Sequence, residues 1–67
     1  MKHFIKITDW YWVPGSSKEM IYVDDKGKKF IGPPSEVIVG ETIIVEGSEF
    51  LEDGCRRIIR FVGRLKG

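Results

Sequence analysis

Cysteine and histidine are almost missing from this sequence. Cys55 and His3 are the only residues of their types among 67. A single cysteine cannot form an internal disulfide, and one cysteine with one histidine cannot build a zinc site of the usual Cys/His type. The sequence therefore predicts no metal and no cofactor. Because very small domains commonly need a further source of stability, we expect a homo-oligomer.

Long apolar runs are missing as well. No segment approaches the roughly 18 apolar residues of a membrane span, and the first ten residues contain no apolar core of a secretory signal. We therefore expect no membrane partner and a reducing, cytoplasmic setting. No window of ten or more residues repeats its apolar positions at the helical period, so no long helix is predicted.

Known catalytic motifs are also lacking. The chain has no glycine-rich phosphate loop, no zinc-protease helix motif, no calcium loop and no nucleophile set near a histidine base. Two acidic pairs exist, Asp24-Asp25 and Glu52-Asp53, but both fall at predicted turns, where solvent would reach them. We therefore predict that the protein is not an enzyme and has no catalytic residues.

What the sequence does contain is a series of strand patterns separated by turn residues. Alternating apolar positions and many β-branched and aromatic residues predict strands over residues 2–13, 19–24, 28–31, 41–46 and 55–66. The first pattern exceeds the usual strand length, so we expect a bend near Thr8-Asp9. Residues 35–39 fit a short strand and a single helical turn equally well.

These strands predict one all-β domain over residues 1–67. A long bent first strand and a proline break at Pro33-Pro34 match the outline of a small five-stranded antiparallel barrel of the OB or SH3-like type. An open curled sheet built from the same strands is the alternative. This comparison concerns architecture only, and it carries little weight for function.

A glycine turn sets the expected register of the first hairpin. A two-residue loop at Lys26-Gly27 would place Val23 opposite Phe30.

The last hairpin turns at Asp53-Gly54, the strongest hairpin signal in the chain. A strict two-residue loop would set the charge of Glu46 on the core face. We therefore expect one bulge at Gly47. The resulting pairs are Val45 with Gly63 and Ile43 with Leu65.

The last predicted strand alternates between two faces. The expected core face holds Cys55, Arg57, Ile59, Phe61 and Leu65, and the outer face holds Arg56, Ile58, Arg60, Val62 and Arg64. We call Arg56, Arg60 and Arg64 the arginine ladder. Residues 35–54 carry six acids and no base, so the ladder can neutralise that segment across the sheet. Alternatively, it can bind an anionic partner; both interpretations stay open.

Aromatic residues supply the second candidate binding group. Trp10 and Trp12 share one face of the first strand with Lys6, and not all of that face can enter the core. The predicted binding residues are Lys6, Trp10, Trp12, Tyr22, Arg56, Arg60 and Arg64.

Two functions fit this composition. The first is a self-associating protein-binding or inhibitor module that uses the aromatic residues as anchors, of a size that suits an accessory protein of a phage or mobile element. The alternative is a nucleic-acid or nucleotide-binding barrel, in which the arginine ladder contacts phosphates and the aromatic residues stack on bases. The net charge of only +1 weighs against general nucleic-acid binding.

Overall fold

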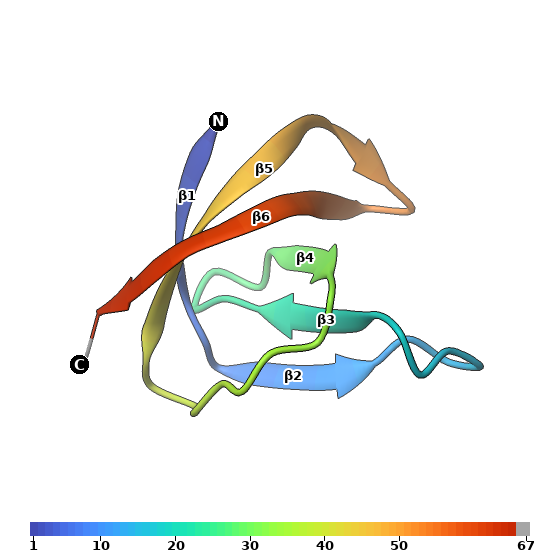
Figure 1. The fold of residues 1–67 in the computed structure, drawn as a ribbon, viewed down its shortest axis with the longest axis horizontal. Helices are drawn as coiled ribbons and strands as arrows, with labels where there is room; N and C mark the ends of the chain where they lie inside the picture. Colours follow the sequence, from blue (N-terminus) through green and yellow to red (C-terminus); the bar gives the residue numbers. More distant parts are fainter. Residues whose placement is uncertain (66–67) are drawn as a thin grey trace.

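The computed structural model describes residues 1–65, so Lys66, the last residue of the final predicted strand, lies outside the described part. Six strands form one mixed sheet in the order β1-β5-β6-β4-β3-β2 (Figure 1). Their bounds are β1 (Lys2–Lys6), β2 (Asp9–Trp12), β3 (Met20–Val23), β4 (Lys29–Gly32), β5 (Thr42–Glu52) and β6 (Cys55–Leu65). The prediction of an all-β fold is confirmed. The sheet is not closed into a barrel by strand pairing, and β4 and β6 pair in parallel, which an all-antiparallel arrangement does not allow.

The predicted bend divides the first strand in two. The backbone N–H of Ile7 donates to the Glu41 carbonyl at 2.8 Å, and the N–H of the next residue, Thr8, donates to the Val23 carbonyl at 2.9 Å. Two consecutive residues thus bond to opposite sides of the sheet: Ile7 to the residue before β5, and Thr8 to the last residue of β3. As a result β1 forms one edge of the sheet and β2 the other, although only two residues separate them (Figure 1).

Residues 35–39 form neither a strand nor a helical turn. This segment is part of an irregular connection from β4 to β5, which runs past β3 and β2 (Figure 1). The hydroxyl of Tyr22 donates to the carbonyl of Pro33 at 2.8 Å, and Val37 packs against the core. Side-chain contacts therefore hold this connection where proline prevents ladder hydrogen bonds.

The core lies on the inner side of the curved sheet. Its buried members come from every strand except β2, together with Ile7 of the bend: Ile5, Ile7, Met20, Tyr22, Phe30, Ile43, Val45 and Ile58. Phe61 packs against this cluster, as predicted, and Cys55 is buried, also as predicted.

The first hairpin has a longer loop than predicted. Val23 lies opposite Lys29 rather than Phe30, and the N–H of Asp24 donates to the Lys28 carbonyl at 3.0 Å. Asp24 is buried rather than exposed to solvent, because its Oδ1 accepts the backbone N–H groups of Lys26 and Lys28 at 2.9 and 2.8 Å. An aspartate that satisfies the turn backbone in this way favours the three-residue loop, and Gly27 takes the left-handed position with φ of 79°.

The second hairpin has the predicted turn. Glu52 pairs with Cys55, and both loop residues, Asp53 and Gly54, have positive φ values of 52° and 79°. This is the geometry of a two-residue type I′ turn.

The register beyond this turn differs from the prediction. Val45 pairs with Phe61 instead of Gly63, and Ile43 pairs with Arg64 instead of Leu65. Irregularities lie at three places along the β5–β6 pair: two lie on either side of Gly47, where one bulge was predicted, and a third lies between Ile44 and Val45.

Two of the irregularities flank the pair of Gly47 and Ile58, and they reset the alternation of faces in β6 at that point. Consequently Ile58 is buried (3% exposed) and Ile59 is 65% exposed, so the predicted faces of these two residues were wrong.

Candidate functional site

The arginine ladder does not form a continuous basic surface. Arg56 donates from Nη1 to the Ser48 carbonyl at 2.6 Å, and Arg64 donates from Nη2 to the Glu36 carbonyl at 2.9 Å. Arg64 also lies 3.6 Å from a carboxylate oxygen of Glu41. Arg60 is exposed and lies across from Glu46 in the neighbouring strand. Two of the three arginines are therefore held by partners within the chain.

Arg57 makes the strongest ion pairs of the β6 strand, although the sequence placed it on the core face. Its guanidinium donates to Glu52 at 2.8 and 3.0 Å and to Glu19. The hydrogen bonds with Glu52 and Glu19 raise the pKa of Arg57, and the bond from Arg57 lowers the pKa of Glu52. The pairing of the acidic and basic segments thus occurs at two places, between Arg57 and Glu52 and between Arg64 and Glu41.

Tyr22 does not lie at the surface, contrary to the predicted role in stacking. Its side chain is fully buried, its ring contacts Phe61 edge-on with centroids 6.1 Å apart, and its hydroxyl is bonded to the Pro33 carbonyl. All four residues of β2 are exposed, whereas Tyr22 of the neighbouring strand β3 lies in the core. Tyr22 is therefore a core residue.

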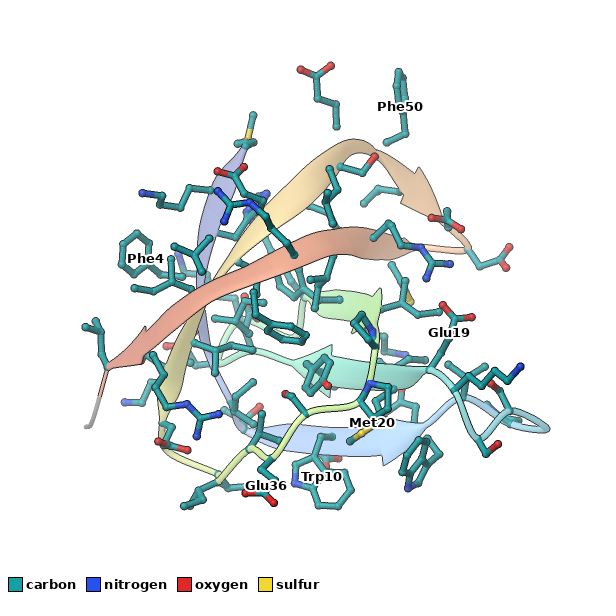
Figure 2. All side chains as sticks on the ribbon, viewed as in Figure 1. Phe4, Trp10, Glu19, Met20, Glu36 and Phe50 are labelled. Atoms are coloured by element: carbon teal, nitrogen blue, oxygen red, sulfur yellow. The ribbon has the colours of Figure 1, made fainter. Side chains whose placement is uncertain are left out.

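Trp10 and Trp12 are brought together at the surface. They are two positions apart on β2 and therefore share a face, with 40% and 47% of their surfaces exposed. A groove of about 520 Å³ runs between them and the connection from β4 to β5. We call it the tryptophan groove, and its lining residues are Trp10, Trp12, Met20, Pro34, Ser35, Glu36 and Val37. Figure 2 labels Trp10, Met20 and Glu36 close together at this edge.

Sequence reasoning found the tryptophans but missed the other wall of the groove. Pro34 belongs to the predicted break between strands, and Val37 belongs to the segment that fitted a short strand and a single helical turn equally well. The two consecutive prolines were the available signal, because prolines prevent further sheet pairing and leave their rings free to line a surface.

Lys6 lies apart from the tryptophan groove. It sits on β1 beside Thr42 of β5, and Thr42 in turn pairs with Leu65 of β6. The adjacent row of the same outer face holds Phe4 and Ile44, and Phe4 is 60% exposed (Figure 2). We call Phe4, Ile44 and Leu65 the outer apolar face. The predicted binding residues therefore do not gather at one place on the molecule.

Comparison of the chain with family models, with curated proteins and with solved structures finds no significant match. In residues 1–65 no group of histidine, cysteine, aspartate or glutamate side chains is arranged to hold a metal ion. No helix in this described part is long and apolar enough to cross a membrane.

Proposed function

We propose that the protein is a non-catalytic protein-binding module and that the tryptophan groove is its binding site. The observation that carries this proposal is the pair of half-exposed tryptophans, which line a ready-made groove together with Met20, Pro34 and Val37. Tryptophan is the residue most often found among the few side chains that dominate interface energies. A module that binds a partner protein through this groove would block the partner's own contact surface, as an inhibitor does.

The groove suits an extended, proline-containing segment of a partner. Grooves lined by aromatic side chains bind polyproline II segments, which lose little conformational entropy on binding. Glu36 supplies the one charged group in the lining, and within residues 1–65 its carboxylate forms no ion pair. We therefore expect the partner segment to carry a basic residue next to its prolines.

Peptide titrations followed by tryptophan fluorescence test this proposal. The probes are a panel of proline-rich peptides with one arginine, together with the same peptides carrying glutamate instead. Saturable binding of the arginine peptides is expected, and Trp12→Ala should weaken it about thirtyfold, the effect of losing roughly 2 kcal/mol at a central anchor. Phe50→Ala is the matched control, because Phe50 is an exposed aromatic residue outside the groove. Equal losses in the two variants, or no saturable binding by any peptide, would refute the proposal.

Self-association is supported by a different surface from the one the sequence indicated. The outer apolar face exposes Phe4 of β1 and Leu65 of β6. Ile44 of β5 lies between these two strands and pairs with Gly63, and the space above Gly63 is open. A two-fold contact through this face would cover apolar surface that a domain of this size cannot bury alone.

Light scattering after size-exclusion chromatography tests the dimer. We expect a mass above 7.7 kDa that falls on dilution. Phe4→Glu should shift the protein to a monomer, whereas Phe50→Glu, a change of equal chemistry at an exposed position elsewhere, should not. A parent mass of one chain at every concentration would exclude self-association.

We further propose that the sheet curls into a partly open barrel of the OB outline. The support is that β1 and β2, the two edges, are joined by two residues, and that a parallel β4–β6 pair lies in the middle of the strand order. The alternative function, nucleic-acid binding through the arginine ladder, has less support. Its stacking and cationic groups lie in different places, and acidic Glu36 lines the tryptophan groove.

A further inference from the structure

A second pocket lies where the two hairpin turns approach each other. It has a volume of about 440 Å³ and is bordered by the β3–β4 turn, by the β5–β6 hairpin and by His3 of β1. Small-molecule sites commonly have volumes of about 300–1,000 Å³, so this pocket is of suitable size. It shares no lining residue with the tryptophan groove. We call it the basic pocket.

Positive charge gathers in the basic pocket. Lys28, Lys29 and Arg56 line it, and Asp53 is the single acidic lining residue, so the charged side chains sum to +2 with His3 neutral (three minus one). The pKa of His3 is lowered, first by burial and then by the charges of Arg56, the N-terminal amine and Lys28. Three cationic side chains against one carboxylate give the pocket a positive charge, which favours an anion.

Arg56 is fixed in position before any ligand arrives. Its Nη1 donates to the Ser48 carbonyl, and its side chain passes close to Gly47, where an added Cβ would lie 3.1 Å from the Arg56 Cδ. One of its five N–H donors is used in the Ser48 bond. A guanidinium held by backbone in this way loses little entropy on binding, and its planar fork matches two oxygens of a phosphate group.

The remaining wall of the pocket is apolar. The ring of Phe30 lies 5.5 Å from that of His3 at an angle of 60°, and Leu51 exposes its side chain on the hairpin. Phe30 and Leu51 each pair with Arg56 from a neighbouring strand, so the apolar groups lie directly beside a cation. This arrangement fits a ligand in which an anionic group adjoins a ring. We infer that the basic pocket binds a small phosphorylated molecule with an attached ring system, of the nucleoside monophosphate class.

Binding can be followed at His3 by NMR, with adenosine monophosphate, inorganic phosphate and adenosine as separate probes. The two phosphate-bearing probes should shift the His3 ring signals and raise the pKa of its imidazole, because a bound anion offsets the surrounding positive charge. Adenosine monophosphate should bind more tightly than phosphate, and adenosine more weakly than adenosine monophosphate. Phosphate binding equal to that of adenosine monophosphate would refute the apolar part of the inference.

Paired lysine variants separate a site from general charge attraction. Lys28→Ala/Lys29→Ala should weaken adenosine monophosphate at least tenfold, equivalent to about 1.4 kcal/mol. Lys2→Ala/Lys6→Ala removes the same charge from exposed positions outside the pocket and should change the affinity less than twofold. Equal weakening in the two variants, or no His3 response to millimolar ligand, would overturn the inference. Trp12→Ala should leave this binding intact, so the result is independent of the tryptophan groove.

Discussion

Adjacent isoleucines in β6 offer a direct test of how this fold is stabilised. Ile58 and Ile59 have the same side chain on the same strand, yet one is buried and the other is exposed. Ile58 lies so close to Gly32 of β4 that a Cβ built on Gly32 would be 2.8 Å from the Ile58 Cβ. Replacing each isoleucine by alanine therefore removes the same atoms from two different environments.

The two substitutions should differ several-fold in cost. Ile58→Ala deletes buried methyl and methylene groups and leaves a cavity, which typically costs about 2–5 kcal/mol. Ile59→Ala removes atoms that are already mostly in water, and its loss of strand preference amounts to at most about 1 kcal/mol. A chain of 67 residues has a total stability of roughly 3–10 kcal/mol, so Ile58→Ala should remove a large part of it.

Urea unfolding followed by tryptophan fluorescence measures both variants. With a denaturant dependence of about 1–1.5 kcal/mol per molar for so small a domain, Ile58→Ala should lower the midpoint by more than about 1 M. Ile59→Ala should lie within about 1 M of the parent. Equal midpoints, or a lower midpoint for Ile59→Ala, would show that the burial assigned to β6 is reversed and that its bulges lie elsewhere.

Three further predictions concern backbone and charge. Gly32→Ala should cost about 1–3 kcal/mol in urea unfolding because its Cβ meets Ile58, whereas Gly63→Ala, with open space around it, should be neutral. Gly54→Val should lower the melting temperature markedly, since φ of 79° costs a side chain about 1–2 kcal/mol or more; unchanged melting would exclude the two-residue turn. Because burial lowers the pKa of His3 in the folded protein, the unfolded chain takes up the proton first as the pH falls through about 6.5. Thermal stability should therefore fall between about pH 7.5 and 5.5, and His3→Gln should reduce that fall; an identical profile would contradict the lowered pKa of His3.

Some features of this protein could be predicted from the sequence because neighbouring residues decide them. The strand pattern, the bend after the first strand and the turn at Asp53-Gly54 depend on β-branched residues, alternation and a glycine with positive φ. The same local reasoning placed Cys55 in the core and indicated that part of the face with Trp10 and Trp12 stays outside it. Here local preference and tertiary structure agree.

Other features depended on contacts between distant segments. Alternation predicts the faces of a strand only while its register is regular, and the two irregularities on either side of Gly47 reversed the assignments of Ile58 and Ile59. The candidate site is of this kind as well. The wall formed by Pro34 and Val37 reaches Trp12 only because the connection to β5 must pass β2. The sequence by itself determined which residues favour strands and turns, since those preferences act over a few bonds. Tertiary structure decided which surfaces those residues form, because burial and register are set by packing among all six strands.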